Sequence, residues 1–215
     1  MKTRALLLAL CCSLLLLAED QPKAPAPVSP DQLWAKLMAG NQRYVTGKTK
    51  AHNLIADRER LSHGQSPHVA VLACSDSRVG PELLFDETIG QLFVVRVAGN
   101  SPDALAIGSM EYAVEHLGTT MIVVMGHQSC GAVKAACSEG KMPSANLDAV
   151  VAPIKASCSL AKGKDVEPAA RNHVHVSAQE LLAKSAILKK RVDEKKLAIV
   201  EAYYSLDTGK VERLK

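Results

Sequence analysis

The stretch "HVAVLACSDSRVGPELLF", residues 68–85, contains the pattern that decides the fold. It begins with Val69 to Ala73, a short run of small and branched apolar residues that is typical of a buried strand. The end of the stretch, "GPELLF", is interpreted as helical. A buried strand that leads directly into a helix is the repeating unit of a parallel sheet with crossover helices.

The same pattern occurs twice more along the chain. Leu92 to Ala98 precedes a helical run that reaches Leu117, and Met121 to Met125 precedes "CGAVKAAC". Two further helical stretches, at about 146–161 and 168–190, lead to a last strand at 197–203 and a short "VERL" end. These alternating elements predict an α/β fold with no second domain boundary.

Residues 1–18 have the composition of a leader. Lys2 and Arg4 precede a 14-residue run without a charge that ends at Ala18. Such a run suits a signal peptide better than a membrane span, which needs about 20 apolar residues. We expect export to the periplasm with cleavage after Ala18, although Leu16 is large for the −3 position. A lipid-modified Cys11, which would anchor the protein to a membrane, is one alternative; an apolar helix of a cytosolic domain is the other.

Residues 19–30, "EDQPKAPAPVSP", contain four prolines and are predicted to be a semi-extended tether. The tether ends in a helix start, because Ser29 and Gln32 have the spacing of a capping box around Pro30. The predicted domain is 31–215, and it begins with an N-terminal helical arm.

The composition sets limits on the function. The chain has 215 residues, is 47% hydrophobic and carries a formal charge of +4, which falls to +2 when the two basic residues of the leader are removed. These values suit one globular domain with a sizeable core. No concentrated basic face is present, so nucleic acid is not an expected partner.

Three metal-ligating side chains follow predicted strands. Cys74 follows the first strand, and His127 and Cys130 follow the third. Functional residues of open parallel sheets collect where strands end and helices begin, so these three should meet. Two thiolates and an imidazole suit zinc. Structural zinc sites close the tetrahedron with four ligands, whereas three protein ligands and one open position are typical of a catalytic site.

Asp76 and Arg78 alternate with Cys74. At the end of an extended strand, side chains two residues apart point the same way, so all three are expected on one face. Asp76 could then take the fourth zinc position in a closed, inactive state. Arg78 offers a planar, bidentate partner that would hold the carboxylate away from the metal. A surface salt bridge without such a gating function is the alternative.

Several ordered motifs across residues 31–215 resemble the β-class carbonic anhydrases. The signature pair is "ACSDSRV" at 73–79 and "GHQSCGAV" at 126–133. Further matches lie at 37–48 ("LMAGNQRYVTGK"), 92–100 ("LFVVRVAGN"), 110–118 ("MEYAVEHLG") and 203–214 ("YYSLDTGKVERL"). The resemblance implies a mixed, mostly parallel sheet flanked by helices, and at least a homodimer whose N-terminal helix reaches over its partner.

The resemblance also implies the site residues. Zinc would be held by Cys74, His127 and Cys130, with Asp76 and Arg78 as the catalytic dyad. Substrate contacts would come from Gln65, Phe93, Tyr112 and the backbone of Gly131, with some of these side chains supplied by the neighbouring subunit.

The activity implied is reversible hydration of CO₂ to bicarbonate and a proton by a zinc-bound hydroxide. Two alternatives stay open: a hydrolase of a CO₂ analogue such as carbonyl sulfide, and a zinc-binding structural or interaction protein without turnover.

Cys137 and Cys158 remain outside this set. Each follows an apolar residue, Val133 or Ile154, by four positions, which places both on apolar helical faces. Two buried, reduced thiols are the favoured interpretation. A disulfide between two consecutive helices is the alternative that an oxidising compartment would permit.

Overall fold

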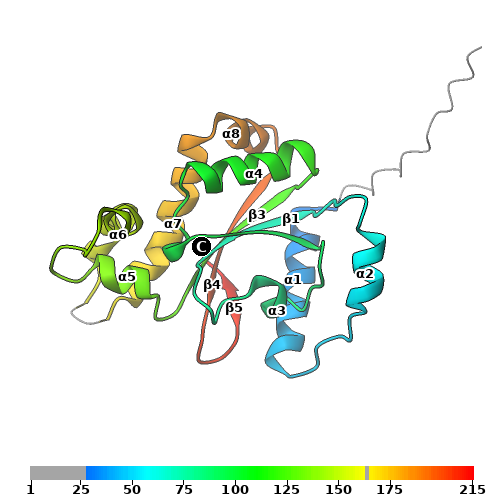
Figure 1. Ribbon diagram of the computed structural model, residues 1–215, viewed down its shortest axis with the longest axis horizontal. Coiled ribbons are helices and arrows are strands. Elements are labelled where there is room, and N and C mark those ends of the chain that lie inside the picture. The colour runs from blue at the N-terminus through cyan, green and yellow to red at the C-terminus, as the bar shows by residue number, and fades with distance from the viewer. Residues whose placement is uncertain (1–27, 163–164) are drawn as a thin grey trace, which may run out of the picture.

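The computed structural model describes residues 28–162 and 165–215, so the predicted leader and most of the predicted tether lie outside the described residues. Five strands form one sheet in the order β2-β1-β3-β4-β5 (Figure 1). Their bounds are β1 Val69–Ala73, β2 Leu92–Arg96, β3 Met121–His127, β4 Ala198–Tyr204 and β5 Val211–Arg213. The first four pair in parallel, and β5 runs antiparallel to β4. The sheet is therefore mixed and mostly parallel, as predicted.

Helices surround this sheet. The α-helices are α1 Pro30–Val45, α2 Leu54–Arg60, α3 Pro81–Leu84, α4 Ala104–His116, α5 Gly131–Ala136, α6 Ala145–Val151, α7 Glu167–Lys184 and α8 Ala186–Asp193. Two 3₁₀ segments complete the set, η1 Ala98–Asn100 and η2 Ala152–Leu160. None of the helices within the described residues is long and apolar enough to cross a membrane.

Some predicted boundaries were wrong. The helical stretch at 146–161 is divided into α6 and η2, and Pro153 at the start of η2 explains the break, because proline cannot continue the hydrogen bonding of α6. The stretch at 168–190 is divided at Ser185, whose hydroxyl caps the backbone N–H of Leu188 at 3.1 Å. Helix α2 was not predicted, and it contains no buried residue.

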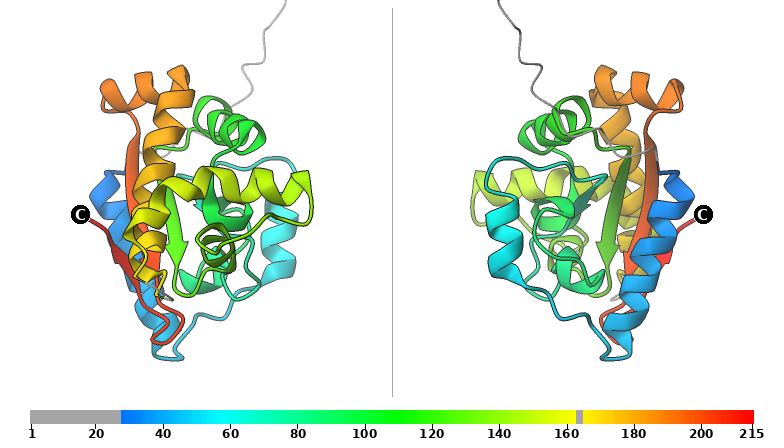
Figure 2. Two further views of the ribbon diagram at one scale, coloured as in Figure 1. Left: turned by 90° about the vertical axis from the view of Figure 1, so that its left-hand side faces the viewer. Right: turned by 90° about the vertical axis from the view of Figure 1, so that its right-hand side faces the viewer.

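The two faces of the sheet have different partners. Side chains of even-numbered residues in β1 and β3, such as Leu72 and Val124, belong to a cluster with α4, α7 and η2. Odd-numbered neighbours, such as Val71 and Val123, pack with Leu33 and Leu37 of α1. The two helical layers lie on opposite sides of the sheet (Figure 2). Burial on both faces explains why β1 and β3 are continuous apolar runs rather than alternating ones.

Helix α1 begins with the predicted capping box, since Ser29 and Gln32 exchange hydrogen bonds at 3.0 and 3.3 Å. Further along, the buried amide of Asn41 donates to the carbonyls of Leu84 and Gly209 and accepts from the N–H of Val211. The helical arm therefore packs on the sheet of its own chain. Its reach over a partner subunit stays a prediction.

Candidate metal centre

The three predicted ligands meet at one edge of the sheet. Cys74 directly follows β1, His127 is the last residue of β3, and Cys130 is the N-cap of α5. Because β1 and β3 are parallel neighbours, their carboxyl ends lie together. One ligand atom from each residue lies within 4.8 Å of the others, and all three side chains are buried.

The donor set fits a zinc ion. The Nδ1–H of His127 donates to the carbonyl of Gln128 at 2.9 Å, which leaves Nε2 as the nitrogen with a free lone pair. That Nε2 is buried and has no hydrogen-bond partner in the described part of the chain. The sulfur atoms of Cys74 and Cys130 lie 4.0 Å apart. Tetrahedral zinc with bonds of ~2.3 Å would hold two sulfurs about 3.8 Å apart, so a small rearrangement suffices.

Electrostatics favour a cation at this point. The Cys130 thiol and the backbone N–H of Gly99 hydrogen-bond to Cys74 and lower the pKa of Cys74. The same contact with Cys74, together with burial, raises the pKa of Cys130. Two adjacent buried sulfurs resist carrying two negative charges, and a divalent cation removes that penalty.

The loop between His127 and Cys130 is tight. Ser129 adopts a left-handed conformation with φ +55°, which is uncommon for a residue with a side chain. Both the backbone and the side chain of Gln128 are fixed. Its backbone N–H donates to the carbonyl of Tyr204 at 2.9 Å, and its side-chain amide donates to the carboxylate of Asp207 at 2.6 Å. The Gln128 carbonyl, which accepts the hydrogen bond from His127 Nδ1, is therefore held in place by the turn after β4.

Asp76 and Arg78 form a bidentate pair, but not in the predicted way. Strand β1 ends at Ala73, and the Asp76 carbonyl accepts the N–H of Val79 in a turn. The expected extended alternation of 74, 76 and 78 was wrong. Instead, the turn brings Arg78 Nε and Nη2 to 2.9 and 2.7 Å from the two carboxylate oxygens of Asp76.

This pair keeps the Asp76 carboxylate ionised and in place. The hydrogen bonds from Arg78 hold the pKa of Asp76 well below its usual range. Asp76 is not part of the close cluster of three ligand atoms found among the described residues. Arg78 thus binds both carboxylate oxygens of Asp76.

Comparisons with known proteins agree with this geometry. A family model described as carbonic anhydrase matches residues 69–211. Carbonic anhydrase 2 of Mycobacterium tuberculosis strain H37Rv is 38% identical over 189 residues, which cover 85% of this chain and 91% of that protein. The chain belongs to the β-class carbonic anhydrases. It is an enzyme of the family whose activity is the hydration of CO₂.

Solved structures support the fold of this carbonic anhydrase. Tetrameric β-carbonic anhydrases from Sordaria macrospora match with a TM-score of 0.68 at 24% identity, covering 85% of this chain and 96% of theirs. The β-carbonic anhydrase CcaA matches with a TM-score of 0.66 at 27% identity, covering 85% and 88%.

The predicted substrate residues are distributed over both ends of the sheet. Gly131 lies beside Cys130, and a Cβ added there would meet nothing within 4 Å. Phe93 pairs with Ala70 in the register of the sheet. Ala70 lies four residues before Cys74, so Phe93 is displaced from Cys74 by about 13 Å along the strand direction. Tyr112 contacts Phe93, with ring centroids 6.4 Å apart, and Gln65 lies on the loop that enters β1. These three therefore lie away from the metal ligands of their own chain.

Other residues at the centre of this carbonic anhydrase were missed by the sequence analysis. The N–H of Gly99 donates to Cys74 Sγ at 3.3 Å. Arg96 donates to the carbonyls of Cys74 and Asp76 and so braces the loop after β1. The Gly99–Asn100 pair lies shortly after the end of β2, and it was the local sequence signal that could have located this contact.

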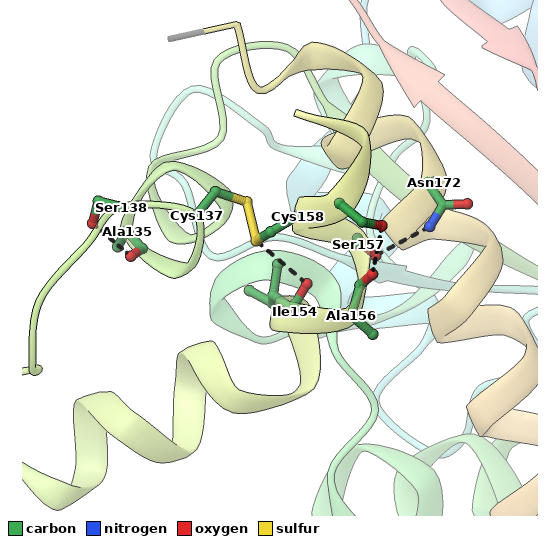
Figure 3. The surroundings of a disulfide bond; sticks show 9 residues. Ala135, Cys137, Ser138, Ile154, Ala156, Ser157, Cys158 and Asn172 are labelled. Atoms are coloured by element: carbon green, nitrogen blue, oxygen red, sulfur yellow. Dashed lines mark hydrogen bonds between the residues drawn. A yellow bond between two sulfur atoms is a disulfide. The ribbon is translucent and has the colours of Figure 1, made fainter. Parts of the chain in front are cut away.

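Cys137 and Cys158 are joined by a disulfide with a Cα–Cα distance of 5.1 Å (Figure 3). The favoured interpretation of two reduced thiols was wrong, because the C-cap of α5 lies directly against η2. Ile154, one turn before Cys158, is completely buried and lies 2.5 Å from the position of a Cβ added to Gly99. The disulfide thus joins the helix that follows Cys130 to the segment that packs on Gly99.

Proposed function

We propose that this carbonic anhydrase holds Zn²⁺ through Cys74, His127 and Cys130 and converts CO₂ and water to bicarbonate and a proton. The observation that supports zinc best is the buried His127 Nε2, which has no hydrogen-bond partner in the described chain and lies beside two thiols. When bound, zinc supplies a hydroxide nucleophile, because a zinc site with an open position lowers the pKa of its water to about 7.

The remaining chemistry belongs to the chain. Asp76 is an acceptor fixed by Arg78, so it can receive a hydrogen bond from the attacking oxygen and orient a lone pair towards CO₂. The Arg78 side chain is 52% exposed, yet it binds both carboxylate oxygens and also approaches the Ser129 carbonyl at 3.5 Å. It therefore keeps Asp76 from becoming a metal ligand, which would occupy the reactive position.

We also propose that the active unit is a homodimer. Gln65, Phe93 and Tyr112 lie away from the proposed metal ligands of their own chain and would line the pocket of the partner. In support, β2 is an edge strand, and Leu105 and Tyr112 on the adjacent helix α4 are 82% and 50% exposed. Exposed apolar side chains beside an unpaired strand edge suit burial by a second copy.

The decisive experiment combines zinc analysis with a CO₂ hydration assay on the purified protein. We expect about one zinc per chain, and turnover that is lost together with zinc in Cys74→Ser. Zinc without turnover would indicate the structural alternative. Preferential turnover of carbonyl sulfide in the same assay would indicate the hydrolase.

Mixed dimers test the shared pocket. Gln65→Ala and Cys130→Ala chains are each impaired, but a hybrid dimer contains one site with both residues intact. We expect mixing after unfolding and refolding to restore activity above that of either parent. No gain, despite hybrid formation verified by mass spectrometry, would contradict sharing.

Export to the periplasm completes the proposal. The Cys137–Cys158 disulfide suits an oxidising compartment, and disulfides of this kind are rare in reducing ones. Cell fractionation with amino-terminal sequencing should find the chain in the periplasm, beginning after Ala18. A membrane fraction that becomes soluble in Cys11→Ser would instead identify a lipid anchor.

A further inference from the structure

His173 of α7 is a buried histidine that neither the metal centre nor the dyad uses. Only 1% of its surface is exposed, and burial lowers its pKa, so the ring is neutral near pH 7. Two serine hydroxyls approach the same ring nitrogen: Ser101 Oγ lies 2.9 Å and Ser177 Oγ lies 3.3 Å from Nε2. A polar group this deep in the core needs partners, and these hydroxyls supply them.

A chain of hydrogen bonds links His173 to Asn100 as well as to Ser101. Asn100 Nδ2 donates to Ser177 Oγ at 3.4 Å, so the Ser177 proton is free to point at His173. Ser101 Oγ meets the same Nε2, whereas the buried Nδ1 has no hydrogen-bond partner among the described residues, so both contacts of the ring run through Nε2.

Ser101 and Asn100 belong to the loop that contacts the metal centre. Gly99 and Asn100 both have positive φ, +76° and +50°, so this loop needs interactions that hold it in an uncommon conformation. Its N–H at Gly99 donates to Cys74 Sγ at 3.3 Å. Groups that hydrogen-bond to a metal ligand, backbone N–H groups included, set the orientation and basicity of that ligand.

We propose that His173 is a positioning residue for the metal ligand Cys74. It fixes Ser101 from one side and Asn100, through Ser177, from the other. Gly99 directly precedes these two residues, so its N–H is then aimed at the sulfur. This inference rests on the proposed zinc site and adds to it a residue almost 100 positions away in the sequence.

The experiment compares zinc release from purified holoenzyme variants at 25 °C, with the chelator 4-(2-pyridylazo)resorcinol as the probe. His173→Leu keeps much of the volume and removes both hydrogen bonds. We expect zinc release to become roughly tenfold faster, at the lower end of what such supporting contacts contribute. His173→Gln should restore the rate to within about threefold of the original, because its amide oxygen can reach the position of Nε2.

His175→Leu is the matched control. His175 is on the same helix, but its side chain is 53% exposed and bonds to Glu201, away from the metal centre. Its zinc release should be unchanged. If His173→Leu does not fold, Ser101→Ala removes one of the two hydroxyls in a milder way and should still accelerate release.

The outcomes separate the two proposals. If the wild-type chain binds zinc and hydrates CO₂ but His173→Leu or Ser101→Ala releases zinc at the wild-type rate, the positioning function is overturned and the proposed activity stands. A lower melting temperature in His173→Leu with unchanged zinc release would likewise assign His173 to the core alone. If the wild-type chain binds no zinc, both proposals fail.

Discussion

Replacement of both Cys137 and Cys158 by alanine should destabilise the enzyme measurably. The disulfide joins residues separated by 21 positions. In the loop-entropy treatment, a crosslink of this span restricts the unfolded chain enough to stabilise the native state by about 3 kcal/mol at 25 °C. For a chain of this size, each kcal/mol shifts the melting temperature by about 2–4 °C, so the double variant should melt roughly 6–12 °C lower.

The position of the crosslink suggests that this loss will reach the metal centre. Helix α5 has six residues, which is too short for a stable helix without tertiary support. Its first turn follows Cys130, and its C-cap is held to η2 by the disulfide (Figure 3). We therefore expect the double variant to bind zinc at 25 °C but to lose it at lower temperature than the wild type.

Thermal and urea unfolding, followed by circular dichroism at matched zinc content, measure the effect. Peptide mapping without reduction should first identify the linked peptide that contains residues 137 and 158. Single alanine variants at either position provide controls, and each should lose nearly as much stability as the double variant. A loss below about 1 kcal/mol in the double variant would show that the crosslink does not restrict the unfolded chain as reasoned.

Four substitutions test the site itself. Arg78→Ala should retain zinc but lower turnover by about 100-fold in stopped-flow CO₂ hydration, because it frees Asp76 to reach the metal. Near-normal turnover would show that Arg78 does not keep Asp76 from the metal. Asp76→Asn should also retain zinc and lose much of the rate. Arg78 lowers the pKa of Asp76, so the ionised carboxylate stabilises the folded state at every pH above its unfolded pKa of about 3.9. That stabilisation is lost only in stronger acid. Asp76→Asn should therefore leave the pH dependence of the free energy of unfolding unchanged between about pH 5 and 9. Gly131→Ala places a methyl group in open space at the start of α5, where the proposed pocket lies. Activity should therefore fall, while the melting temperature should stay the same or rise, because alanine favours a helix more than glycine does. Unchanged activity would show that Gly131 is not part of the pocket. Ser129→Gly should raise the free energy of unfolding by up to about 1 kcal/mol in urea titrations, because it relieves a left-handed conformation; a destabilised variant would show that the Ser129 side chain has a further partner.

The elements nearest the site could be predicted because their signals are local. Strands β1 and β3 are covered on both faces, so every position must be apolar and each run stands out in the sequence. The polar residue that follows such a run is conspicuous for the same reason, and Cys74 and His127 were found in this way. Zinc is then the metal that a site of two thiols and an imidazole favours.

The parts that could not be predicted depend on contacts between distant segments. Helix α2 buries nothing, so its sequence has no apolar stripe to mark it. The pairing of Cys137 with Cys158 depends on how α5 docks on η2, and spacing alone cannot state that. The turn at Asp76 was mistaken for extended chain because alternation of polar residues also fits a strand, and the hydrogen bonds that close the turn are not visible in the residue types.

Each of the three proposed metal ligands depends on a different distant part of the chain. His127 is oriented by the Gln128 carbonyl, and Gln128 is fixed by Asp207 in the turn after β4. The environment of Cys74 depends on Gly99 and, as proposed, on His173 of α7. Cys130 begins the short helix that the disulfide joins to η2. Asp207, Gly99, His173 and η2 are all distant in sequence from the ligand that they support, so the three ligands reach one point only when the whole sheet and both connecting segments have folded. Zinc binding should therefore report on folding of the complete domain, and truncation before β4 should abolish it rather than weaken it.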